Sequence, residues 1–92
     1  MASNVTYCHY ALVPNLSKQR QNPALVSLGE AIRQTRLERG ISQESLALLA
    51  EVDRSYIGRV ERGDNNVAVL TLIKVAQALN VSVCDLMKEA EL

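Results

Sequence analysis

The sequence predicts an all-α domain of five short helices that follow an N-terminal arm. From residue 25 onward, apolar residues recur at the three- and four-residue spacing of amphipathic helices. Between these stretches stand residues that end one helix or begin the next, notably Gly40, Ser42, Gly63 and Asn80. The chain has 92 residues, 48% hydrophobic content and no net charge, values typical of one small globular domain rather than of disorder. Aromatic residues make up only 3%, so we expect an aliphatic core.

Residues 1–24 differ in composition from the rest and are interpreted as an arm. Pro14 and Pro23 bracket a Gln/Asn-rich stretch at residues 19–22, a composition typical of a linker. The segment Val5–Val13 is rich in β-branched and aromatic residues, which fits either a short strand or a disordered arm. The folded domain is therefore expected to span residues 25–92.

The first two helices have clear ends. Leu25, Leu28 and Ile32 form one helical stripe, and this first helix is expected to stop at Gly40, which readily takes the left-handed conformation. Ser42 is a favourable N-cap for the second helix. The buried side of that short helix is expected to consist of Leu46, Ala47, Leu49 and Ala50.

The third helix follows the second after a very short connection. Asp53 is its N-cap candidate and Gly63 its end, with Ile57 and Val60 facing the core. Only Glu51 and Val52 separate the second helix from that cap, so the two helices must turn sharply against each other.

The last two helices complete the predicted core. The segment from Leu70 to Leu79 is apolar on more than one side, which predicts a central helix ended by Asn80. Ser82 and Asp85 resemble a capping box with Asp in place of the usual Glu. The helix that they begin carries Val83, Leu86 and Met87.

Several classes of function are disfavoured. No signal peptide and no apolar run of the ~18 residues that a membrane span requires is present, so we expect a cytoplasmic protein without membrane contact. Cys8 and Cys84 match no metal-binding spacing and are interpreted as free thiols. The single His9 has no partner that would suggest catalysis. We therefore expect no enzyme, no metal, no cofactor and no small-molecule ligand.

Charge is unevenly distributed along the chain. The ten cations and ten acids cancel overall, but residues 25–65 contain six arginines together with seven acids. Such a segment either gathers local positive potential on one folded face or forms a solvated face with many ion pairs. Composition alone favours the second interpretation.

The arrangement of the second and third helices points to DNA. Two short helices joined by a tight turn, with helices on either side, form a helix-turn-helix, whose second helix lies in the major groove. Because Ile57 and Val60 face the core, the third helix should turn outward Arg54, Ser55, Gly58 and Arg59, with Tyr56 at the margin. Arginine pairs bidentately with guanine, and Ser42 and Gln43 begin the second helix where a phosphate would lie.

The residues of these two helices also carry a family resemblance. Ser42-Gln43-Glu44-Ser45-Leu46-Ala47 and the run from Asp53 to Gly63 resemble the XRE-type helix-turn-helix regulators, which include the lambda-type phage repressors and Cro. The resemblance covers about residues 25–88. Asp-Arg-Ser-Tyr-Ile-Gly followed by Glu-Arg-Gly-Asp-Asn-Asn is especially similar to the controller proteins of restriction–modification systems, which are small dimeric regulators. The resemblance implies a compact five-helix lambda-repressor-like fold that binds a two-fold symmetric double-stranded DNA operator as a homodimer.

The resemblance also implies roles for individual residues. Arg36 and Glu61 look like the family's ion pair between the first helix and the end of the third. Tyr56 either contacts DNA or packs its ring against the loop, and Arg62 either contacts phosphate or is a solvated helix end. The implied DNA contacts are Ser42, Gln43, Arg54, Ser55, Tyr56, Arg59, Arg62, Asn65 and Asn66.

The sequence departs from the family pattern at two places. Glu51 stands where the family usually has glycine in the turn between the two helices, so some backbone strain is expected there. Val67 and Ala68 stand where the family usually has proline and a serine cap.

The last helix is the expected dimer interface, through Val83, Leu86 and Met87, unless these residues close the core of the monomer. A competing hypothesis is an antitoxin-like protein-binding module whose segment Val5–Val13 engages a partner protein. Deletion of residues 1–22 separates the two hypotheses, because a pure regulator should keep most of its DNA affinity without them.

Overall fold

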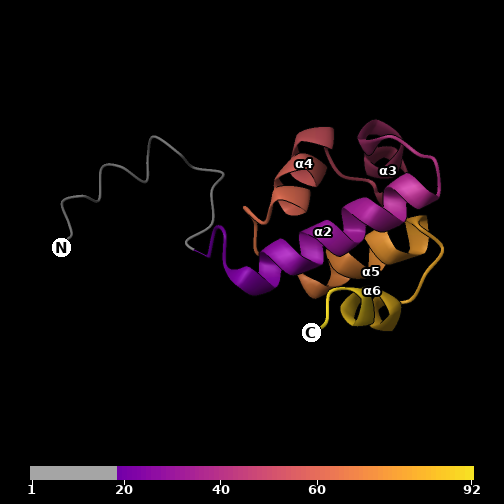
Figure 1. The fold of residues 1–92 in the computed structure, drawn as a ribbon. Coiled ribbons are helices and arrows are strands. Elements are labelled where there is room, and N and C mark those ends of the chain that lie inside the picture. Colours follow the sequence, from indigo (N-terminus) through magenta and orange to yellow (C-terminus); the bar gives the residue numbers. More distant parts are fainter. Residues whose placement is uncertain (1–18) are drawn as a thin grey trace, which may run out of the picture.

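The computed structural model describes residues 19–92, which fold into five helices and contain no strand (Figure 1). The predicted all-α, five-helix fold is confirmed. The hypotheses on Val5–Val13, Cys8 and His9 lie outside the described residues. The helices are α2 (Pro23–Glu38), α3 (Gln43–Ala50), α4 (Arg54–Arg62), α5 (Val69–Ala78) and α6 (Val83–Glu89).

Helix α2 begins earlier than the sequence pattern suggested. The Asn22 side chain accepts a hydrogen bond from the Ala24 N–H, and Pro23 occupies the first helical position, where a missing N–H has no consequence. Pro23 therefore belongs to the helix, and its interpretation as part of a linker was wrong. The helix ends before Gly40, whose φ of 71° is the predicted left-handed conformation.

Helix α3 has the predicted cap but a narrower buried face. The Ser42 side chain accepts a hydrogen bond of 3.0 Å from the Ser45 N–H. Leu46, Ala47 and Ala50 are buried, whereas Leu49, which was expected with them, is 60% exposed. A helix turns about 100° per residue, so Leu49 points well away from the arc that these three residues share.

The core is aliphatic, as predicted, and α2 runs across its middle between α4 and α6, while α3 packs on α4 and α5 (Figure 1). Its largest fully buried side chains come from all five helices: Ile32, Leu46, Ile57, Val60, Val75, Leu79 and Leu86.

Gly29 allows the close approach of α2 and α4. A Cβ at this position would lie 2.7 Å from the Glu61 carbonyl oxygen and even closer to that of Val60. Both obstacles are backbone atoms and cannot rotate away. Sequence reasoning did not single out Gly29, because its neighbours in space lie on a different helix.

The ends of α5 and α6 follow local signals. Ala68 occupies the N-cap of α5 and makes no side-chain cap, in keeping with the absence of the family's serine. Asn80 has a φ of 59°, the predicted left-handed residue. The capping box is complete: the Asp85 N–H donates to Ser82 Oγ over 2.9 Å, and the Ser82 N–H donates to Asp85 Oδ2 over 3.2 Å.

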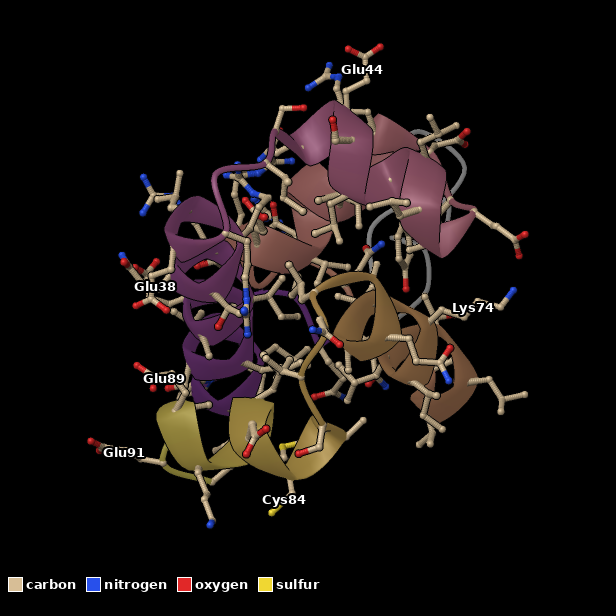
Figure 2. The ribbon with its side chains drawn as sticks, turned by 90° about the vertical axis from the view of Figure 1, so that its right-hand side faces the viewer. Glu38, Glu44, Lys74, Cys84, Glu89 and Glu91 are labelled. Atoms are coloured by element: carbon tan, nitrogen blue, oxygen red, sulfur yellow. The ribbon has the colours of Figure 1, made fainter. Side chains whose placement is uncertain are left out.

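Leu86 requires a correction. It is 1% exposed and belongs to the core of its own chain, so it cannot form a surface as predicted. Val83 and Met87 are half-buried and pack against the same core. Cys84, on the same helix, has an exposed thiol (Figure 2).

Within the described residues, no single helix meets the length and apolarity expected of a membrane span; α5 and α6 meet them only as a pair, bent by 91°.

Candidate nucleic-acid interface

The turn between α3 and α4 is built on one left-handed residue. Glu51 has φ 62° and ψ 42°, and the Val52 N–H donates to the Ala47 carbonyl over 2.9 Å. This is the conformation for which the family uses glycine. Asp53 takes the N-cap position of α4, as predicted, but its side chain makes no capping hydrogen bond. The helix start is therefore held by backbone geometry and packing.

The orientation of α4 matches the prediction. Ile57 and Val60 are 0% and 2% exposed and face the core. Arg54 and Ser55 lie on the exposed side, and Arg59 is half-exposed. The core side of α4 therefore carries neither arginine.

Gly58 differs from the expectation that it lies open on this outer side. It is buried, and a Cβ there would lie 3.2 Å from Arg62 Nη1 and 3.9 Å from Gln43 Oε1. The glycine is thus covered by the ends of two polar side chains. On the outer side of α4, the side chains of Gln43 and Arg62 therefore lie over the helix backbone at Gly58.

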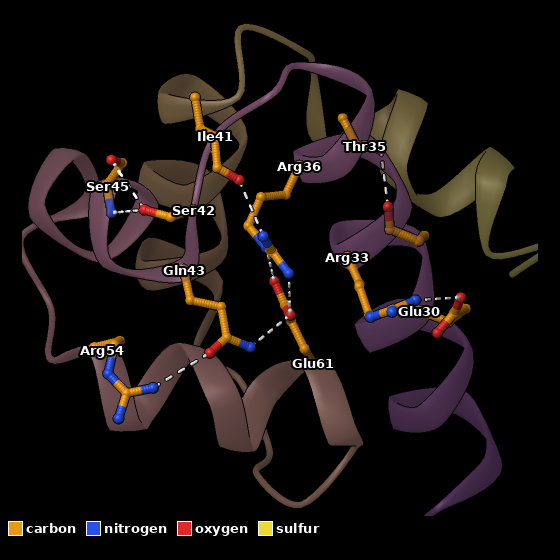
Figure 3. A network of polar contacts seen from close by, with 11 residues as sticks. Glu30, Arg33, Thr35, Arg36, Ile41, Ser42, Gln43, Ser45, Arg54 and Glu61 are labelled. Carbon is orange, nitrogen blue, oxygen red and sulfur yellow. Dashed lines mark hydrogen bonds and ion pairs between the residues drawn. The ribbon is translucent and has the colours of Figure 1, made fainter.

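A buried ion pair ties α2 to the end of α4 (Figure 3). Arg36 Nε lies 2.6 Å from Glu61 Oε2, and Arg36 Nη2 donates to Glu61 Oε1 over 3.2 Å. Arg36 Nη1 also donates to the Ile41 carbonyl over 3.0 Å. The two side chains are 10% and 2% exposed. The predicted ion pair is therefore present, with the charge-assisted two-point geometry that a buried arginine–carboxylate pair requires.

The same carboxylate orients Gln43, as Figure 3 shows. Gln43 Nε2 donates to Glu61 Oε1 over 2.9 Å, which leaves its carbonyl oxygen directed away from Glu61. Arg54 Nη1 donates to that oxygen over 3.4 Å. One continuous chain of polar contacts thus runs from Arg36 in the interior to Arg54 on the exposed side of α4.

Tyr56 and Arg59 form a second pair on α4. The guanidinium carbon of Arg59 lies 5.9 Å from the centre of the Tyr56 ring, within the range of a cation–π contact. Burial raises the pKa of the Tyr56 phenol, and its hydroxyl hydrogen-bonds the Thr71 side chain on α5, which partly offsets the rise. The ring is half-buried and packs against the core, rather than against the loop that one of the two alternatives named.

Ser42 and Arg62 have partners within the chain. Ser42 Oγ donates to Ser45 Oγ over 3.1 Å besides capping α3, so its side chain is used structurally. Arg62 Nε donates to Asp64 Oδ2 over 3.2 Å, although its side chain is 62% exposed. Asn66 is exposed, and Asn65 is half-buried in the same loop.

Asp64 is a site residue that sequence reasoning missed. It is only 6% exposed, and its pKa is held below the usual value, first by a hydrogen bond from Gln21 and further by Arg62 and Arg20. Gln21 Nε2 lies 2.6 Å from Asp64 Oδ1. Because these partners are 43 residues apart, no local pattern announces them.

Exposed acidic side chains lie on several elements, including Glu44 on α3 and Asp53 before α4. Glu38, Glu89 and Glu91 point outward from α2 and the C-terminal end (Figure 2), parts of the fold that carry none of the predicted DNA contacts. Among residues 19–92, no group of His, Cys, Asp or Glu is placed to hold a metal ion.

Two short helices at a tight left-handed turn, the second with outward arginines on a fixed core face, define a helix-turn-helix DNA-binding domain. The comparison with protein families agrees, since the family described as Helix-turn-helix matches residues 32–86. The chain belongs to this family of DNA-binding transcription regulators.

Curated relatives narrow the class. The chain is 48% identical over 56 residues to control protein C.SmaI of Serratia marcescens, covering 61% of this chain and 67% of that protein. It is 40% identical over 60 residues to control protein C.BamHI of Bacillus amyloliquefaciens, covering 64% and 74%.

Solved structures give the same result. The restriction–modification controller protein C.AhdI from Aeromonas hydrophila superposes with a TM-score of 0.67 at 45% identity, over 67% of this chain and 94% of that one. The controller protein C.Esp1396I superposes with a TM-score of 0.69 at 31% identity, over 74% and 87%. The predicted resemblance to controller proteins is confirmed.

Proposed function

We propose that this regulator acts as a homodimer that reads a two-fold symmetric operator and controls a restriction–modification system. The observation that carries the proposal is the chain of contacts from Arg36 through Glu61 and Gln43 to Arg54. It fixes two polar side chains on the outer side of α4 before DNA is bound. The names of the similar control and controller proteins support the assignment to such a system.

We assign the predicted contacts to two roles. Arg54 and Arg59, with Ser55 between them, read base edges, since Arg54 and Ser55 are exposed on α4 and Arg59 is half-exposed. Backbone phosphates are met by Gln43, by the N–H groups that follow Ser42, and by Arg62, Asn65 and Asn66. Tyr56 acts mainly by packing under Arg59.

Dimerisation follows from the limited reach of one recognition helix. Two-fold related helices of this class sit roughly 34–36 Å apart on successive major-groove faces. Since Leu86 is buried, we place the partner surface on α5, whose outward residues Val69, Leu70 and Ile73 are 69%, 75% and 36% exposed. The hydroxyl contact between Tyr56 and Thr71 ties the start of α5 to α4. A partner seated there would set the spacing of the recognition helices. Val83 and Met87 remain proposed contributors at its edge.

Sedimentation tests the dimer. Leu70→Asp should give monomers at micromolar concentration, because an unpaired charge in an apolar interface is costly. Leu48→Asp is the matched control, since Leu48 is an equally exposed leucine (79%) on α3. Dimers of unchanged stability for Leu70→Asp would place the interface elsewhere.

Selection from a pool of random duplexes tests the operator. The full chain should enrich a two-fold symmetric consensus, and a pool without enrichment would contradict the proposed function. We further propose that the protein acts in the cytoplasm by binding alone, without catalysis, cofactor or small ligand.

A further inference from the structure

The turn at residues 19–22 is tied to the C-terminal end of α4. The Gln21 backbone N–H donates to the Gly63 carbonyl over 2.6 Å, and its side-chain amide donates to the Arg62 carbonyl over 2.8 Å. Carbonyls at a helix end lack partners within the helix, so these bonds satisfy two of them. The start of the described chain therefore lies beside the end of the proposed recognition helix, although it precedes the residues matched by the family (Figure 1).

Asp64 is at the centre of this junction. Its carboxylate accepts from the Gln21 amide and pairs with two arginines, Arg20 Nε at 3.3 Å and Arg62 Nε at 3.2 Å. The carboxylate side chain is 9% exposed, whereas the arginine side chains are 53% and 62% exposed. A buried anion thus holds two exposed cations next to each other.

Arg20, Arg62 and Asp64 together carry one net positive charge, and the two arginines retain N–H donors that Asp64 does not use. A guanidinium has five N–H donors, and contacts through Nε do not use the two terminal amino groups. Asn66 extends the polar surface, and together with Gln19 and Asn22 it lines an adjacent hollow of about 320 Å³. The planar fork of a guanidinium group matches the oxygen geometry of a phosphate, and here two such groups are held on one carboxylate.

We propose that Asp64 is a positioning residue that holds Arg20 and Arg62 as a two-arginine clamp for one phosphate of the duplex backbone, beside the bases that α4 reads. This inference rests on the proposed function, because it requires α4 to lie in the major groove. The clamp adds affinity and register without sequence preference, since phosphates are the same at every base pair.

The effect of Asp64→Asn on DNA affinity distinguishes a positioning role for Asp64 from a purely electrostatic one. Asp64→Asn raises the net charge by one, so charge counting expects tighter DNA binding. The clamp predicts the reverse, namely weaker binding. The slope of the logarithm of the association constant against the logarithm of the salt concentration should fall by about one to two units, because the arginines are no longer positioned to contact the phosphate. Asp53→Asn is the matched control, an exposed aspartate at the start of α4 without a capping bond. It should bind as tightly as the unchanged chain or more tightly.

The measurement is fluorescence anisotropy of the full chain on a labelled random-sequence duplex over a series of NaCl concentrations. Arg20→Ala and Arg62→Ala should each reduce the slope by about one unit. Arg20→Ala should cost little more once Asp64→Asn is present. Gln21→Ala changes no charge and should still reduce the slope, so it decides the question if Asp64→Asn melts below the assay temperature.

Binding by Asp64→Asn that equals or exceeds that of Asp53→Asn, or an unchanged slope for Gln21→Ala, would overturn the clamp. Such results leave the operator selection unaffected. A chain that binds no duplex at all fails the proposed function instead, so the two failures are distinguishable.

Discussion

Two glycines inside helices should respond in opposite directions to the same substitution. Alanine is favoured over glycine by about 1 kcal/mol in a helix interior. Propensity alone therefore predicts that Gly29→Ala in α2 and Gly58→Ala in α4 both stabilise the protein.

The surroundings of Gly29 reverse that expectation. Its new Cβ would lie 2.7 Å from the Glu61 carbonyl oxygen and closer still to that of Val60, against 3.4 Å or more for an ordinary contact, so α2 and α4 must separate by more than about 0.7 Å. Overpacking of this kind costs about 1–3 kcal/mol. The separation also stretches the Arg36–Glu61 pair, now 2.6 Å between Nε and Oε2. We expect a net loss of about 1–3 kcal/mol in the free energy of unfolding, of which the upper end includes the weakened ion pair.

The surroundings of Gly58 do not oppose the change. The nearest atom to its new Cβ is Arg62 Nη1 at 3.2 Å, the end of an exposed side chain that needs to move by only a few tenths of an ångström. Gly58→Ala should therefore stabilise by up to about 1 kcal/mol. Urea unfolding followed by circular dichroism measures both variants. A Gly29→Ala protein at least as stable as the unchanged chain would refute the close packing of α2 on α4.

Three further predictions concern the site. Arg54→Ala or Arg59→Ala should cost ~1–3 kcal/mol on the selected operator and relax the preference at one base pair, measured against single-base operator variants; an equal loss on every sequence would show a phosphate contact instead. Glu61→Ala should destabilise the fold by about 3–5 kcal/mol in urea because it leaves the Arg36 charge buried, and the double replacement Arg36→Met, Glu61→Leu should cost less; equal costs would contradict the pairing. The pKa of Asp64 is lowered on folding, so its contribution to stability is complete above its unfolded pKa of about 3.9 and is lost as the pH falls through the lower folded value. Urea midpoints below about pH 4 should thus fall less steeply for Asp64→Asn than for the unchanged chain.

The features that the sequence predicted well depend on neighbours within a few residues. Ser42 caps α3, Ser82 and Asp85 form their box, and Asn80 is left-handed, because a helix end is determined by the groups of one turn. The family's glycine position was also readable, and Glu51 adopts the left-handed conformation that it implies.

The features that it predicted poorly depend on contacts between distant segments. Leu49 has the spacing of a buried residue, yet its side chain is 60% exposed. Gly58 faces outward on α4 but is covered by side chains from another helix and from the next turn. Asp64 belongs to a polar loop in the sequence, and its role depends on the turn at residues 19–22, which packs on it. Periodicity gives the direction of a side chain and not what lies in front of it.

Two buried carboxylates at the C-terminal end of α4 play the same role. In the last turn of the helix, the buried Glu61 carboxylate accepts from Arg36 and from the amide of Gln43. Just beyond the helix, the buried Asp64 carboxylate accepts from the amide of Gln21 and pairs with arginines. In both places a buried anion compensates the arginine charge and limits the rotation of a long polar side chain. Ordering such a side chain at an interface costs about 0.5–1.5 kcal/mol on binding, and side chains already ordered in the free protein avoid most of that loss. A chain with no net charge can therefore bind a polyanion without an excess of basic residues, because part of its acidic complement lies inside the fold and holds the exposed arginines in place.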